Sequence, residues 1–423
     1  MNFKFWSKKA VGVIAAGAIG AAVTFFPSAM PIAEAGLLES LIGAGIQVAA
    51  MSEQINYFDD KGRDDLYVQM RSENGVNDDP VLNERLDVIM ANLTAGIAAV
   101  DPSINEKPYN YFINPDTSFN AFCSLGNNIS VNTGLFDLTN NDDEIAVVIA
   151  HEMAHGQKKH VKKGYNKRIP VILGSVAISE ATGGLGGAVL GAVISNQLTA
   201  KSITKPQEWE ADNIAFDYIN NTDYNPGACA ALWQRVLEKM NTEGAGNFVG
   251  EIFAPSDHPT NEQRRNNYSK KLTEMSDGRM TVAEGTITLN GKNFLVCAVD
   301  EENDMSAAER AYFIAGNLAK LYKDTNPKAV KKAQEKAKKE AQKAVEKLAE
   351  EAEENGEEGT YKKRNFSLDE MAKQANKGPV LRQLPQKAYV EDGMLFVDGI
   401  YIMNENNGEP SVVELADIFN QIK

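Results

Sequence analysis

The chain has 423 residues, a formal net charge of −15 and 43% hydrophobic residues. This length suffices for two or three domains with hydrophobic cores, and the composition excludes a wholly disordered chain. The acidic balance argues against a nucleic-acid partner, because phosphate contacts require clustered lysine and arginine side chains. The cysteines, Cys123, Cys229 and Cys297, allow at most one internal disulfide.

The N-terminus has the pattern of an export signal. Lys4, Lys8 and Lys9 precede an apolar stretch that runs to Phe26, and the small-residue triplet Ala33-Glu34-Ala35 follows. We expect residues 1–35 to be a signal peptide that is cleaved after Ala35. The mature protein would then be periplasmic or otherwise exported. A retained membrane anchor is the alternative, since the apolar stretch is long for a signal peptide.

Helical and strand-like patterns alternate in the first half of the chain. From residue 36 to about residue 99, apolar residues recur at steps of three and four, which predicts helices with one buried face. Residues 109–138 contain short strand-like pieces separated by Asn, Gly, Asp and Pro turns, which predicts a small sheet. This mixture indicates an α+β fold.

The stretch "IAVVIAHEMAHGQKKH", residues 145–160, holds three of the four histidines of the chain. Acidic and cap-forming residues precede it, so a helix should begin near Asn141. His151 and His155 are four residues apart and face the same side of that helix, while Glu152 lies about 100° round from His151. Two histidines and a glutamate are costly in an apolar helix without partners. The pattern therefore predicts a zinc site, although a buried helix with chance histidines is the simpler alternative.

A catalytic zinc needs a third protein ligand. His160 is an unsuitable candidate, because five residues past His155 is about 140° away on a continuing helix. Glu208 and Asp212, in "EWEAD", share one helix face, so the first can bind zinc while the second orients a histidine. By the same geometry Glu210 points elsewhere. An ordinary acidic helix face fits the spacing equally well.

Residues 169–198 are apolar and glycine-rich, and fit either a hairpin of buried helices or a surface in peripheral contact with a membrane. After about residue 273 the sequence changes character. Residues 284–299 and 387–403 resemble hairpins with Asn-Gly or Asp-Gly turns, and we expect them to pack together. Between them, residues 325–358 are rich in Ala, Lys and Glu and predict a long solvated helix, which we interpret as a spacer rather than a coiled coil.

Four motifs, in this order, resemble the HtpX-like and BepA-like zinc metallopeptidases of peptidase family M48, of the gluzincin type. They are "NAFCSLGNNISVNTGLF", "DDEIAVVIAHEMAHGQKKH", "EWEADNIAFDY" and "DHPTNEQRR". The resemblance covers residues 36–271. It implies a mainly helical zincin-type domain over residues 36–273, with residues 274–423 as a C-terminal accessory module. It also implies one zinc ion per chain, bound by His151, His155 and Glu208, with Glu152 as general base and Asp212 as a further catalytic-site residue.

The resemblance extends to residues outside the metal site. His258 matches a histidine that approaches the zinc and either gates it or stabilises the oxyanion, and Arg264 falls on the arginine of the same motif. Asn120, Ala121 and Phe122 match the start of an edge strand that holds substrate backbone by β-addition. The sequence departs from the family just after this strand, where Leu125-Gly126-Asn127 replaces the usual Pro-Gly-Gly.

These expectations combine into an exported zinc-dependent endopeptidase whose substrates are polypeptides, namely misfolded or misassembled proteins of the cell envelope. The substrate class rests on the resemblance alone. The alternative is a largely non-proteolytic, chaperone-like binding protein of the envelope, in which His258 keeps the zinc blocked.

Overall fold

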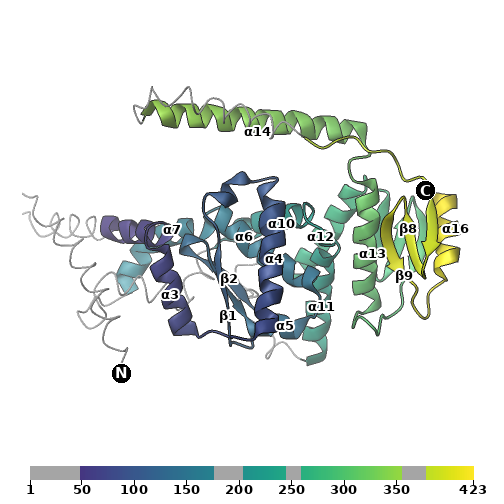
Figure 1. The fold of residues 1–423 in the computed structure, drawn as a ribbon, viewed down its shortest axis with the longest axis horizontal. Helices are drawn as coiled ribbons and strands as arrows, with labels where there is room; N and C mark the ends of the chain where they lie inside the picture. Colours follow the sequence, from purple (N-terminus) through teal and green to yellow (C-terminus); the bar gives the residue numbers. More distant parts are fainter. Residues whose placement is uncertain (1–47, 176–202, 244–258, 355–377) are drawn as a thin grey trace, which may run out of the picture. The chain divides into compact units, whose positions relative to one another are not determined.

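The computed structural model describes residues 48–175, 203–243, 259–354 and 378–423 (Figure 1). The chain forms two compact units, the first from Met1–Tyr224 and Lys239–Asn261 and the second from Asn225–Glu238 and Glu262–Lys423. Within the described ranges, every helix is too short or too polar to cross a bilayer. The predicted signal peptide and residues 176–198 of the apolar segment lie outside the described residues. The predicted domain boundary after residue 273 stays a prediction.

The first unit is mainly helical around one small sheet, which agrees with the predicted α+β class. Residues 48–59 form a helix. The further elements are α3 (Arg63–Asn74), α4 (Pro80–Ala98), η2 (Pro102–Asn105), β1 (Asn110–Asn114), β2 (Ala121–Ser124), η3 (Leu125–Asn127), β3 (Asn128–Asn132), α5 (Thr133–Leu138), α6 (Asp142–Gln157), α7 (His160–Ser175) and α10 (Lys205–Ile219).

The sheet has the order β1-β3-β2, with β1 parallel and β2 antiparallel to β3. β2 turns into β3 through η3, where Gly126 has φ 75°. A Cβ at Gly126 would lie 2.5 Å from the Cβ of Arg63, so the close approach of α3 requires glycine here. An apolar cluster that includes Ile55, Leu66 and Phe112 joins the helix 48–59, α3, the sheet and α7.

Helix α6 lies at the centre of this unit and packs against α4, α10 and β2. Asn141 caps its first turn by accepting a hydrogen bond from the Asp143 N–H at 2.9 Å. All residues from Glu144 to His155 are buried. The helix ends at Gln157, and Lys159 adopts a left-handed φ of 54° that lets α7 begin one residue later. The histidine motif therefore lies on a helix that is buried on all sides.

The second unit contains α11 (Ala228–Glu243) as far as Glu238 and α12 (Asn261–Met275) from Glu262 onward. Two three-stranded antiparallel sheets follow. The remaining elements are β4 (Met280–Ala283), β5 (Thr286–Leu289), β6 (Lys292–Val296), α13 (Ala307–Tyr322), α14 (Pro327–Glu354), β7 (Ala388–Glu391), β8 (Met394–Val397), β9 (Ile400–Asn404) and α16 (Val412–Ile422). Helix α14 occupies most of the stretch where the sequence predicted a long helix.

Each sheet and the helix that follows it form a βββα unit. We call these units repeat one (β4 to α13) and repeat two (β7 to α16). Each has a two-residue turn with both φ values positive after its first and second strands, at Glu284-Gly285 and Asn290-Gly291 and at Asp392-Gly393 and Asp398-Gly399. Each has a register shift in the middle strand, between Ile287 and Thr288 and between Leu395 and Phe396. Each helix begins with a Ser-x-x-Glu capping box.

The repeats exchange packing contacts. Helix α13 packs on β4 and β5 of its own repeat and on β9 of the other, while α16 packs on β7 and β8 and on β6. The buried Arg310 of α13 completes the junction, because it binds Asp300 of repeat one at 2.7 Å and Glu409 of repeat two at 2.8 Å. The two repeats therefore pack against each other reciprocally and share one core.

Candidate metal centre

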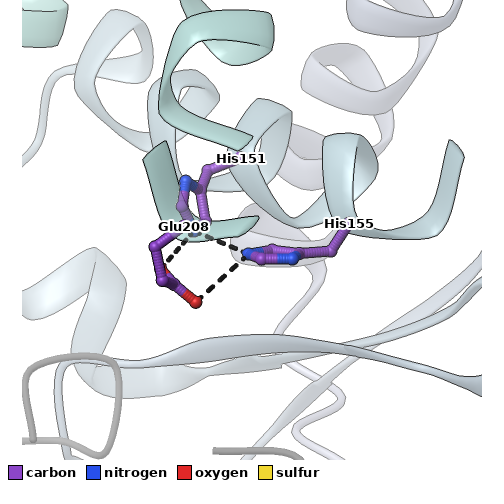
Figure 2. A group of neighbouring side chains, drawn as sticks. All are labelled: His151, His155 and Glu208. Atoms are coloured by element: carbon purple, nitrogen blue, oxygen red, sulfur yellow. Dashed lines mark hydrogen bonds and ion pairs between the residues drawn. The ribbon is translucent and has the colours of Figure 1, made fainter. Parts of the chain in front are cut away.

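Two imidazoles and one carboxylate converge between α6 and α10 (Figure 2). The Nε2 atoms of His151 and His155 are 3.0 Å apart, as expected for residues four apart on one helix face. Glu208 of α10 reaches both, with one oxygen 3.4 Å from His151 Nε2 and the other 3.6 Å from His155 Nε2. All three side chains are buried, so the fold brings these donor atoms together away from water.

The donor set fits a zinc ion. Ligand atoms about 2.0–2.1 Å from zinc at tetrahedral angles lie about 3.3–3.4 Å from one another. The two Nε2 atoms are 3.0 Å apart, and each lies 3.4 or 3.6 Å from a different oxygen of Glu208, so all these separations are near that value. Two imidazole nitrogens and one carboxylate oxygen also leave a fourth position open, as catalytic zinc sites do.

The protonation state of His155 suits a ligand. Burial lowers its pKa to about 3, against the opposing effect of the nearby Glu208 carboxylate. The imidazole is therefore neutral at pH 7, which is the form that binds a metal.

Each histidine of the pair makes a second contact through its other ring nitrogen. His151 Nδ1 lies 2.9 Å from the fully buried carboxylate of Asp212, the position predicted for an orienting residue. His155 Nδ1 lies 3.0 Å from Nδ1 of His160, whose Nε2 lies 3.2 Å from Glu210. If His155 binds a metal through Nε2, its Nδ1–H donates to His160, and His160 Nε2–H donates to Glu210. One consistent set of tautomers therefore serves the whole chain of contacts.

Glu210 lies outside the ligand set, as expected, and contacts His160 instead. The assumed separation of His160 from the His155 face was wrong. The helical-wheel argument treated residues 151–160 as one continuous helix. Because α6 ends at Gln157 and Lys159 turns the chain, His160 at the start of α7 comes back against His155. The signal for this turn, a left-handed lysine, has no distinctive sequence pattern.

Glu152, on the same helix, contacts strand β2. The Cys123 N–H donates to its carboxylate at 2.9 Å. The Asn132 N–H donates to the Asn120 carbonyl, which makes Asn120 and Asn132 a hydrogen-bonded pair of the antiparallel ladder. Hydrogen-bonded and non-hydrogen-bonded pairs alternate along such a ladder, so the N–H groups of Ala121 and Cys123 face away from β3. Burial, together with the Glu152 charge, raises the pKa of the Cys123 thiol well above its ordinary value, which keeps the thiol neutral.

The predicted substrate residues have separate places. Asn120, Ala121 and Phe122 lie at and just before the start of β2, which is an edge strand of the described sheet, and all three are buried. The Asn120 Oδ1 is buried and has no hydrogen-bond partner among the described residues. Arg264 belongs to the second unit, where its guanidinium lies 3.9 Å from the centre of the Trp233 ring. His258 lies outside the described residues. The roles of all five stay predictions.

Two histidine ligands one turn apart and a carboxylate ligand from a second helix, with a further glutamate directly after the first histidine, are the arrangement typical of a zinc metallopeptidase. The profile of peptidase family M48 matches residues 82–271, which confirms the resemblance to that family over this part of the chain.

Three relatives illustrate the similarity. The beta-barrel assembly-enhancing protease of Yersinia pestis is 27% identical over 188 residues, which are 41% of this chain and 37% of that protein. Metalloprotease LoiP of Escherichia coli (strain K12) is 28% identical over 188 residues, 43% of this chain and 69% of LoiP. The mitochondrial metalloendopeptidase OMA1 of Saccharomyces cerevisiae is 26% identical over 164 residues, 38% of this chain and 46% of OMA1. The chain thus spans less than half the length of two of these relatives.

Proposed function

We propose that this protein is an exported zinc-dependent endopeptidase that hydrolyses peptide bonds in misfolded or misassembled proteins of the cell envelope. The observation that carries the proposal is the meeting of Glu208, from a separate helix, with both histidine Nε2 atoms of α6. A purely structural helix gives no reason for three donor atoms of the kinds that zinc prefers to meet at one buried point. The relatives named as proteases, including one named for enhancing β-barrel assembly, support the substrate class.

The residues have distinct roles in this proposal. His151, His155 and Glu208 would hold one zinc ion per chain, and Asp212 would orient His151. Zinc, when bound, supplies Lewis acidity that polarises the scissile carbonyl and acidifies water. Glu152 takes the proton of the attacking water and returns it to the leaving amine. His258 would steady the oxyanion, as the family resemblance implies.

Strand β2 would hold the substrate backbone. The outward N–H groups of Ala121 and Cys123 are the donors that an added strand requires. Glu152 occupies the Cys123 N–H in the structure at 2.9 Å, so the general base would have to release this donor when a substrate strand pairs along the edge. Engagement of substrate and freeing of the base would then be coupled.

Periplasmic or other exported localisation is part of the proposal and rests on the signal pattern of residues 1–35. The alternative function is a zinc-gated, chaperone-like binding protein that retains polypeptides without cleaving them.

The deciding experiment compares the mature wild-type chain with Glu152→Gln at matched zinc content. Both are incubated with an unfolded protein, and new peptide termini are detected by mass spectrometry. Gln keeps the size of Glu152 and is expected to retain zinc, because Glu152 is not in the ligand set. Cleavage by the wild type alone supports the endopeptidase.

Two other results would count against it. Absence of cleavage in both zinc-loaded proteins, with the client still bound, favours the gated binding protein, and His258→Ala is then the variant that should release activity. Equal loss of zinc in Glu152→Gln and in Glu208→Ala would overturn the assignment of general base and ligand.

A further inference from the structure

The two repeats of the second unit have matching inner faces. Repeat-one strand positions correspond to repeat-two positions 108 residues later, as Met280 does to Ala388 at the starts of β4 and β7. The inward positions are apolar and buried in both repeats: Met280, Ile287, Leu289, Phe294 and Leu295 in the first, and Ala388, Leu395, Val397, Ile402 and Met403 in the second. The sheets therefore share one core pattern.

The outer faces differ at one row of residues. In repeat two, Tyr389, Phe396 and Tyr401 are cross-strand partners and form an aromatic row over all three strands. The Tyr389 and Phe396 rings are stacked with centroids 5.7 Å apart, and the Phe396 and Tyr401 rings meet edge to face at 6.0 Å. Tyr401 is 41% exposed and the other two are half-buried.

Repeat one shows that the fold does not need these rings. The cross-strand partners at the corresponding row are Thr281, Thr288 and Asn293. Repeat one nonetheless has the same two turns, the same register shift and the same capping box. An aromatic row that one repeat has and the other lacks is therefore explained by contact with something outside the sheet, since large aromatic side chains are enriched where partners bind.

The charge around the row indicates the kind of partner. In the strands and turns of repeat two, residues 387–404, the charged residues are Glu391, Asp392 and Asp398 against the single Lys387, and all four are exposed. Glu391 lies two residues after Tyr389 on β7 and so projects on the same face. Asp392 and Asp398 are exposed in the adjoining turns. Aromatic rings with carboxylates beside them attract guanidinium and ammonium groups, which stack on the rings.

We propose that the aromatic row binds an extended polypeptide segment that carries arginine and lysine side chains. The rings would take the cations and the aliphatic stems of these residues, and the carboxylates would supply the opposite charge. The site is independent of the metal centre, so it stands whether or not the chain is a peptidase.

The test uses the mature chain with Glu152→Gln, so that a peptide probe stays intact. The probe is a fluorescent peptide of alternating arginine and glycine, and its affinity is measured by anisotropy. The matched variant carries Tyr389→Thr, Phe396→Thr and Tyr401→Asn, the residues that repeat one holds at these positions. It keeps every charge of the protein. The single substitution Tyr401→Asn, at the most exposed ring, serves if the triple variant does not fold by circular dichroism.

We expect the triple variant to raise the Kd at least about tenfold and Tyr401→Asn to raise it about threefold, since each cation–ring contact contributes modestly. Equal binding by wild type and folded variants would overturn the proposal, because attraction to the net negative charge alone would then explain it. Failure of the probe to bind the wild type overturns it too. A chito-oligosaccharide that binds in place of the peptide, and is lost in the variants, would make the row a glycan platform instead.

Discussion

Asp212→Asn isolates the orienting contact of the metal centre from its ligands. The Asp212 carboxylate lies 2.9 Å from His151 Nδ1 and is fully buried. An amide of the same shape still accepts a hydrogen bond but lacks the charge that fixes the histidine proton and strengthens the ligand. Removing such a contact costs metal affinity about 10- to 100-fold. This corresponds to about 1.4–2.8 kcal/mol, the size of one hydrogen bond to a charged group.

The stability of the metal-free protein should change in the opposite sense. Glu152, Glu208 and Asp212 are 6%, 2% and 0% exposed, and Glu208 and Asp212 both contact His151. Neutralising one buried carboxylate relieves repulsion among the group when no metal is present. The Tm of apo Asp212→Asn is therefore expected to equal or exceed that of the apo wild type, while its zinc Kd rises.

The assay is competition with a fluorescent zinc chelator at fixed pH, with differential scanning calorimetry of the apo proteins alongside. An unchanged zinc Kd in Asp212→Asn would refute the orienting role. A large fall in apo Tm would show that Asp212 serves the fold, and any loss of affinity would then follow from local unfolding.

Two further predictions concern other contacts of the first unit. His160→Ala should raise the zinc Kd roughly tenfold, because it removes the partner of His155 Nδ1. Glu210→Gln changes a half-exposed carboxylate and should alter the zinc Kd less than about threefold. Competition with a zinc chelator measures both. Asp59→Asn should lower the free energy of unfolding by about 3 kcal/mol at pH 7, because Asp59 is buried and pairs with Lys107 and Lys162; urea titrations at several pH values measure this. Although burial raises the pKa of Asp59, the lysines and the Gly126 N–H hold it below its ordinary value, so the stabilisation is complete above about pH 4 and is lost as the pH falls through the folded-state pKa.

Each of these two predictions can be contradicted by a specific result. A larger effect of Glu210→Gln than of His160→Ala would mean that the acidic residue acts on the metal directly. A difference between wild type and Asp59→Asn that persists undiminished at pH 2 would mean that packing, rather than the charge, carries the stabilisation.

The sequence was informative where chemistry depends on local spacing. The pair His151 and His155, with Glu152, followed from the helix period, and the family resemblance to M48 is confirmed. The choice of Glu208 with Asp212 could not be separated from an ordinary acidic helix face by spacing alone, because the four-residue step is common to both. Only the tertiary approach of α10 to α6 distinguishes them.

Contacts that depend on a single backbone turn were not predictable. The return of His160 to His155 needs the end of α6 at Gln157 and the left-handed Lys159. In the second unit, the Asn-Gly and Asp-Gly turns predicted the hairpins, yet the repeat was missed because the inner-face residues share apolar character rather than identity. Their register emerges only from strand pairing.

The exchange of helices between the two repeats has a consequence for the integrity of the second unit. Because α13 covers β9 and α16 covers β6, neither repeat closes its apolar face alone. A cut in the connector between Tyr322 and Ala388 would therefore leave two fragments that complement each other and reassociate. Their union would then depend on concentration instead of on the high effective concentration that one continuous chain provides.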